Sequence, residues 1–390
     1  MAESLDGKPA GDEAPRFRLH LTQEPVTLVV LAVLAVVLFA WVGGLSRLYY
    51  AQREALGNRW FARGVEDART QKYSAAVIEF RSALLYNRDD YAYQLNLAEA
   101  LIGAGRSAEA DSYLVNLWDR EPENGVVNLE LARIVAQKGD MEAALRHYHN
   151  AIYAAWPNDE ETKRRDARLE LIEFLLNKGA RAQAEAELIA LEANAGDDPE
   201  LQERIGDLFV RTVDYERAFA AYRVSLRSEQ HNPAIEGRAG EAAFELGRYP
   251  LAHRYLQAAL TANAEDTRSA ELLKTTELVL GMDPFQRQVS VAQRHRIVVE
   301  AFKVAGERLD HCSTQKAGEW QTNVAQTSLA QRWTEMNPQI TEATLRRDPD
   351  LVEKAMDVVF DIERQTSTSC GPPTGPDLAL LLIAGLHEGN

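Results

Sequence analysis

The sequence predicts an all-α protein: one transmembrane helix, a solenoid of about six helical hairpins, and a small helical C-terminal module. Three observations predict this. An uncharged apolar segment lies near the N-terminus, similar residues recur every 34 positions through the middle of the chain, and Gly (23) and Pro (14) are modest in number. A chain of 390 residues exceeds one compact core, but a solenoid can extend indefinitely because each repeat packs only on its neighbours.

The N-terminus predicts a short disordered tail followed by a membrane anchor. Residues 1–25 are polar and carry mixed charge, so they cannot bury apolar area. Residues 26–45 are apolar and uncharged, and their length matches the ~20 residues that cross about 30 Å of hydrocarbon. Residues 46–56 predict a helical linker. A cleaved signal peptide is the competing interpretation, but the apolar segment is longer than the apolar core (h-region) of a typical signal peptide, and no A-x-A-like site follows it.

The charges around the apolar segment give nearly balanced orientation signals. Lys8, Arg16 and Arg18 precede it, and Arg47, Arg53 and Arg59 follow it. Because a short tail remains inside more easily than a large domain, the sequence favours a cytoplasmic N-terminus. The C-terminal domain is then predicted on the extracytoplasmic (periplasmic) side of a single-pass membrane protein.

Small and large residues recur at fixed intervals after the anchor. The small position is occupied by Ala76, Ala110, Ala144, Ala184, Ala218 and Ala252, with one insertion between the third and fourth copies. A larger residue follows four positions later, at Phe80, Leu114, Tyr148, Leu188, Tyr222 and Leu256. Small residues allow two helix axes to approach closely, and the larger ones fill the groove between hairpins.

This pattern resembles the tetratricopeptide repeat (TPR) over residues 57–266, as six repeats. Residues 267–284 are then expected to form a capping helix, and residues 285–390, which do not repeat, a helical module. The resemblance implies a protein-interaction scaffold. It also implies that the first helix of each hairpin lines a concave binding groove.

The sequence offers no sign of catalysis, a cofactor or a metal site. It contains no G-x-S-x-G, no phosphate-binding glycine loop, no HExxH and no CxxC. A net charge of −16 argues against nucleic acid as a partner. We therefore predict that the protein is not an enzyme.

The two cysteines admit two interpretations. Cys312 falls on an apolar helical stripe, where a buried thiol is the simpler interpretation. A disulfide between Cys312 and Cys370 is the alternative if the domain lies outside the cytoplasm. The sequence leaves both open.

The resemblance assigns groove positions in both halves of the repeats. They are Phe61, Leu95, Glu99, Ile102, Leu129, Arg133, Leu169, Glu173, Leu176, Glu203, Asp207, Phe244 and Glu245. These positions lack the Lys/Arg/Asn clamp with which related domains hold acidic chaperone C-termini. The second half is acidic with apolar interruptions, which favours a basic or amphipathic helical segment as ligand.

Two alternatives stay open for this surface. The leucines could belong to the inter-helix core and the acids to a solvated face. In function, a membrane-anchored scaffold or assembly factor is favoured, and a permanent structural subunit of a membrane-associated complex is the alternative.

Overall fold

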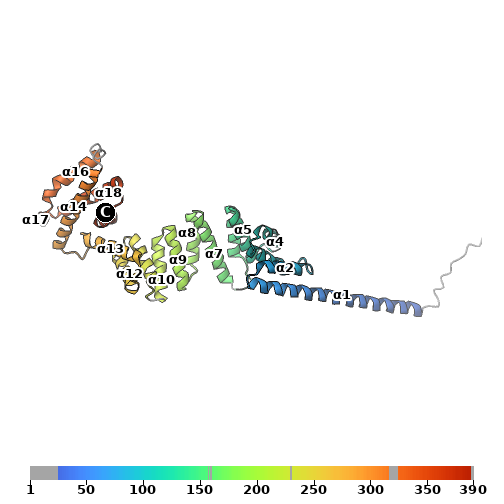
Figure 1. Ribbon diagram of the computed structural model, residues 1–390. Helices are drawn as coiled ribbons and strands as arrows, with labels where there is room; N and C mark the ends of the chain where they lie inside the picture. Colours follow the sequence, from blue (N-terminus) through green and yellow to red (C-terminus); the bar gives the residue numbers. More distant parts are fainter. Residues whose placement is uncertain (1–24, 157, 159, 229–230, 316–323, 388–390) are drawn as a thin grey trace, which may run out of the picture. The chain divides into compact units, whose positions relative to one another are not determined.

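A computed structural model describes the chain except residues 1–24, 157, 159, 229–230, 316–323 and 388–390 (Figure 1). The described residues form α-helices and one short 3-10 helix, without a β-strand, which confirms the all-α class. The chain divides into two compact units, Met1–Asn158 and Asp159–Asn390, each described separately below. The tail predicted at residues 1–25 lies outside the described residues, apart from Pro25.

Helix α1 (Pro25–Arg69) is one uninterrupted helix of 45 residues. It contains the predicted membrane segment, the predicted linker and the first helix of the first repeat. From Leu28 to Gln52 every side chain is exposed, and only the C-terminal part packs on α2 (Figure 1). Within the described residues, α1 is the one helix long and apolar enough to cross a membrane, by length and composition. Its N-terminal part therefore has no protein partner within the chain that the structure describes.

The N-terminal unit continues with antiparallel helices in the order that the repeat predicts. Its further helices are α2 (Tyr73–Leu84), α3 (Tyr91–Gly103), α4 (Ser107–Arg120), α5 (Gly125–Lys138) and α6 (Met141–Tyr153). The predicted small position is fully buried at Ala76, and Gly64 of α1 lies against the ring of Phe80. A Cβ atom at Gly64 would lie 2.6 Å from that ring, so only glycine permits this helix approach.

The C-terminal unit contains three further hairpins and the helix after them. These are α7 (Glu160–Asn177), α8 (Arg181–Glu192), α9 (Pro199–Thr212), α10 (Tyr215–Ser228), α11 (Pro233–Glu245), α12 (Tyr249–Ala262) and α13 (Thr267–Met282). Glycine again allows close helix packing here, because Gly206 lies against the ring of Tyr222 as Gly64 lies against the ring of Phe80. Asp198 and Asn232 cap the N-termini of α9 and α11, accepting hydrogen bonds from backbone amides in the first turn.

The turn within each hairpin requires a left-handed residue. Gly105, Gly139, Gly179 and Gly247 supply it with φ between 67° and 83°. Val213 occupies the equivalent position after α9 with φ 69°, although a β-branched side chain strongly disfavours this region. Backbone strain is therefore stored at one turn of the C-terminal unit.

The last part of the C-terminal unit is a helical module that shares a core with the final repeat. It comprises α14 (Val291–Gln315), α16 (Val324–Met336), η1 (Asn337–Gln339), α17 (Glu342–Arg347), α18 (Asp350–Cys370) and α19 (Pro376–Leu386). Helix α13 contacts both α14 and α19, and one hydrophobic cluster runs from Tyr249 of α12 to Ala384 of α19. The boundaries predicted at 267–284 and 285–390 remain predictions.

Candidate protein-binding surface

Ion pairs connect the first helices of successive hairpins in the C-terminal unit. Glu173 of α7 accepts a hydrogen bond from Arg204 of α9 at 2.5 Å. Glu241 of α11 accepts one from Arg268 of α13 at 2.7 Å. These pairs are largely solvent-accessible, so each contributes about 1 kcal/mol or less to folding.

Arg238 of α11 carries the most connected of these contacts. Its Nη1 atom lies 2.8 Å from Glu203 and 2.9 Å from Asp207, both on α9. Asp207 also accepts a hydrogen bond of 2.8 Å from the hydroxyl of Tyr222, whose side chain is buried. Burial and the neighbouring carboxylate both raise the pKa of Tyr222, so its proton remains available for this bond. Three of the predicted acidic groove residues are therefore bound by arginines of the next hairpin.

The equivalent position in the N-terminal unit is different. The repeat register aligns Glu99 with Glu173, Asp207 and Glu241. Glu99 remains exposed and makes no ion pair within the part of the chain that the structure describes. The protein around it and the carboxylate of Glu130 raise its pKa to about 6, and Arg133 opposes this shift. Arg133 itself donates to Glu130 at 2.5 Å.

The predicted apolar groove residues contribute to packing. Phe61 stacks on Tyr93 with ring centroids 4.9 Å apart, and Leu95 and Ile102 are half-buried against the core of the N-terminal unit. Leu129 and Leu169 are buried, Leu176 is half-buried, and Phe244 lies edge-on to Tyr249. Glu245 is exposed at the end of α11. Whether any of these residues binds a partner stays a prediction.

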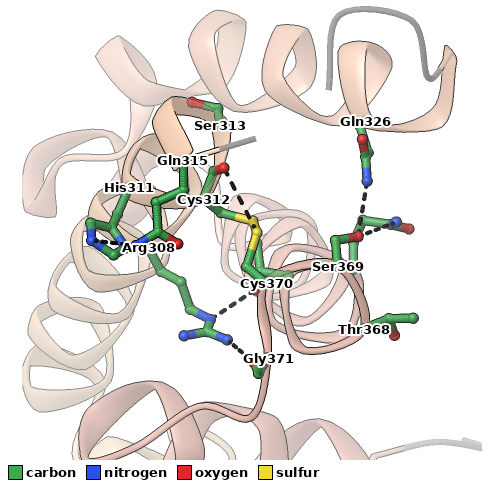
Figure 2. Close-up of a disulfide and its surroundings, with 12 residues drawn as sticks. Arg308, His311, Cys312, Ser313, Gln315, Gln326, Thr368, Ser369, Cys370 and Gly371 are labelled. Atoms are coloured by element: carbon green, nitrogen blue, oxygen red, sulfur yellow. Dashed lines mark hydrogen bonds between the residues drawn. A yellow bond between two sulfur atoms is a disulfide. The ribbon is translucent and has the colours of Figure 1, made fainter. Parts of the chain in front are cut away.

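The C-terminal module holds a disulfide beside the side chain of Arg308 (Figure 2). Cys312 of α14 and Cys370 of α18 are joined, with Cα atoms 5.8 Å apart. One helical turn before Cys312, Arg308 donates to the hydroxyl of Thr366 at 2.8 Å. It also donates to the carbonyl of Gly371 at 2.9 Å. These bonds fix the end of α18 to α14 on both sides of the disulfide.

Arg308 also lies near two carboxyl groups. Its Nε atom is 3.4 Å from the fully buried Glu363, and its Nη1 atom is 3.7 Å from Asp377 of α19. Burial raises the pKa of Glu363 to about 8, with a further contribution from Asp377, while Arg308 lowers it. Glu363 is therefore mostly protonated at neutral pH.

No group of three or more His, Cys, Asp or Glu side chains within the described ranges is arranged to hold a metal ion.

The sequence prediction missed Glu130, Arg204, Arg238 and Arg268. Arg204 and Arg238 are separated by one repeat period, as are Asp207 and Glu241, so the alignment contained the signal for inter-repeat pairing.

Comparisons with known proteins agree with this geometry. A tetratricopeptide-repeat family model matches residues 101–160, which run from α3 to the start of α7. No curated protein matches the sequence.

Several solved structures are similar to the chain. PilW, described as a widely conserved type IV pilus biogenesis factor, is 18% identical with a TM-score of 0.40, and the match covers 57% of this chain and 98% of PilW. Pseudomonas aeruginosa pilF is 14% identical with a TM-score of 0.41, covering 56% and 97%. The C-terminal part of a TPR protein from Cytophaga hutchinsonii is 12% identical with a TM-score of 0.44, covering 80% and 98%.

The hairpins, their period and the left-handed turns define an α-helical repeat protein. The family match identifies a tetratricopeptide repeat at residues 101–160, in a chain that also has one long apolar N-terminal helix.

Proposed function

We propose that the protein is a non-catalytic scaffold or assembly factor, anchored in a membrane by α1, that binds a basic segment of a partner protein. The observation that carries this proposal is the carboxylate of Glu99, an exposed residue that makes no ion pair among the described residues. Its counterparts Glu173, Asp207 and Glu241 are each neutralised by an arginine of the next hairpin. Glu99 is instead placed beside a second carboxylate, that of Glu130.

An arginine or lysine of a partner would relieve the repulsion between Glu99 and Glu130. A cation near a carboxyl group stabilises its charged form, so binding would lower the pKa of Glu99 from about 6. Glu99 must lose a proton to bind the cation when the pH lies below that value. Partner binding should therefore weaken as the pH falls from about 7.5 to 5.5.

The test begins with purification of the full chain from its native membrane in mild detergent, with mass spectrometry of co-eluting proteins. Glu99→Gln should reduce the recovery of a specific partner, by roughly tenfold if one charge-assisted contact is lost. Glu142→Gln is the matched control, because Glu142 is an exposed acid on the second helix of a hairpin in the same unit. Equal recovery with both variants would sink the proposal.

The same experiment separates the scaffold from the permanent structural subunit, which is the second candidate function. A scaffold should co-purify with substoichiometric, salt-sensitive partners. A structural subunit should elute in a complex of fixed stoichiometry that persists at high salt, because obligate interfaces are larger and more apolar.

We further propose that the C-terminal unit lies on the extracytoplasmic side. The support is the bond between Cys312 and Cys370, because stable disulfides are rare in the cytoplasm. Alkylation of intact cells, followed by peptide mass analysis, tests this orientation. Two free thiols in the mature protein would remove its support.

A further inference from the structure

A polar cavity lies where α1 first contacts the rest of the N-terminal unit. Its volume is about 450 Å³, and its walls come from α1 and from the turn between α2 and α3. Tyr50, Arg53 and Glu54 line it from α1, and Tyr86, Arg88 and Asp90 line it from the turn. A cavity of this size is within the range of small-ligand sites.

Close contacts hold the two walls together. Arg53 donates to the carbonyls of Leu85 and Tyr86 at 3.3 and 2.8 Å. Gly57 of α1 approaches Tyr86 and Tyr93 so closely that an added Cβ atom would lie 3.3 Å and 3.0 Å from them. The hydroxyl of Tyr93 donates to Asn58 at 2.7 Å. These contacts fix α1 against the turn and so define the walls of the cavity.

If α1 spans the membrane as proposed, the cavity lies close to the membrane surface. The uncharged segment ends at Leu45, and Arg53 follows eight residues later, which corresponds to ~12 Å at 1.5 Å per residue. Tyr49 and Tyr50, both exposed, lie between them and suit the lipid–water boundary. Leu85, on the same turn as the cavity wall, is 78% exposed and could enter the headgroup layer.

The charges of the cavity match a phospholipid headgroup. The guanidinium of Arg88 is exposed and has no ion-pair partner among the described residues. Arg53 uses one of its nitrogens for the carbonyls and retains other donors. Two arginines suit a phosphate, and Glu54 suits the ammonium of an ethanolamine headgroup.

We infer that this cavity binds the phosphate-bearing headgroup of a membrane phospholipid and so fixes the N-terminal unit against the bilayer. The inference rests on the proposed membrane anchor. The headgroup site would attach the protein to the membrane through polar contacts, in addition to the apolar contacts of α1. A transmembrane helix alone would not require the residues that line this cavity.

The test uses the full chain in maltoside micelles and native mass spectrometry after addition of phosphatidylethanolamine or phosphatidylglycerol. The wild type should retain one phospholipid, and Arg88→Gln should weaken its retention by about tenfold, because one charge-assisted hydrogen bond is removed. Arg146→Gln, an exposed arginine of the same unit that does not line the cavity, should retain lipid like the wild type. Stronger retention of phosphatidylethanolamine should disappear in Glu54→Gln.

Three outcomes would overturn the inference. Retention could be equal in the wild type and both arginine variants, no lipid could be retained, or inorganic phosphate at equal concentration could displace the lipid. The anchor is measured separately by extraction of membranes at alkaline pH. A protein that leaves the membrane there contradicts the proposed anchor, whereas a protein that remains embedded but retains no lipid contradicts only the headgroup site.

Discussion

The two units treat their acidic residues in different ways. In the C-terminal unit, acids at equivalent repeat positions are bound by arginines of the next hairpin. Glu363 of the same unit, whose pKa is raised to about 8, is buried. In the N-terminal unit, the shifted carboxyl group of Glu99 is exposed beside Glu130. The same repeat position thus forms an ion pair with the next hairpin in the C-terminal unit. In the N-terminal unit, at Glu99, it leaves a carboxyl group available to a partner.

The largest expected effect concerns the covalent bond of the C-terminal unit. Cys312→Ser with Cys370→Ser should lower the free energy of unfolding by about 4 kcal/mol, because the bond closes a loop of 58 residues. Denaturant unfolding of the full chain in detergent, followed by hydrogen exchange, should show earlier opening of α14, α18 and α19. Opening of the N-terminal unit should stay unchanged. Equal loss in both units would break the comparison.

The next effect follows from the buried carboxyl group. Glu363 has an ordinary unfolded pKa near 4.5 and a folded pKa of about 8, so the folded state holds an extra proton between these values. The free energy of unfolding therefore falls as the pH rises through this window, by about 3.5 kcal/mol from pH 5 to pH 8. Glu363→Gln should remove this dependence and should unfold like the wild type at pH 5. Thermal melts of the wild type and of Glu363→Gln at several pH values measure this dependence. If stability depended on pH equally in both proteins, Glu363 would not have a raised pKa in the folded state.

A smaller effect should accompany loss of an inter-repeat contact. Arg238→Met should destabilise the C-terminal unit by about 1.5 kcal/mol, because Glu203 and Asp207 lose a shared cationic partner. Arg181→Met, at the exposed start of α8, is the control and should change stability by less than about 0.5 kcal/mol. Similar denaturation midpoints for the two variants would show that these ion pairs do not stabilise the folded unit.

The smallest effect tests the strained turn. Val213→Gly should stabilise the C-terminal unit by about 1 kcal/mol, because glycine removes the left-handed penalty and the valine side chain is half exposed. The mirror experiment in the N-terminal unit, Gly139→Ala, should destabilise by a similar amount. Thermal melts of both variants show whether each substitution raises or lowers the melting temperature. A lower melting temperature for Val213→Gly would show that the valine side chain makes a stabilising contact.

Much of the fold could be predicted from the sequence because it depends on local periodicity. The hairpins, the small residues at helix crossings and the glycines of the turns all repeat with the chain, and the structure confirms the all-α repeat fold. The continuity of α1 was also foreseeable, since no Pro interrupts residues 46–69.

The rest depends on distances between repeats that periodicity does not specify. The acids at Glu173, Glu203 and Asp207 suggested a free acidic surface, but the arginines that neutralise them stand 31 to 35 residues away. Val213 replaces a glycine without any compensating change nearby in sequence. The hydrogen bonds of Arg308 join residues 58 and 63 positions apart in a module that has no repeat.

Helix α1 also determines which way the repeats face. A continuous helix turns by ~100° and advances by ~1.5 Å per residue, so it transmits rotation as well as height. If α1 spans the membrane as proposed, the rotation of the first hairpin about the membrane normal is set by the number of residues between Leu45 and Gly57. Two inserted residues would turn the Glu99 surface to nearly the opposite bearing, about 200° away, while raising it by only ~3 Å. Such a rotation would impair binding of a partner that is anchored in the same bilayer. Binding of a freely diffusing partner would not change.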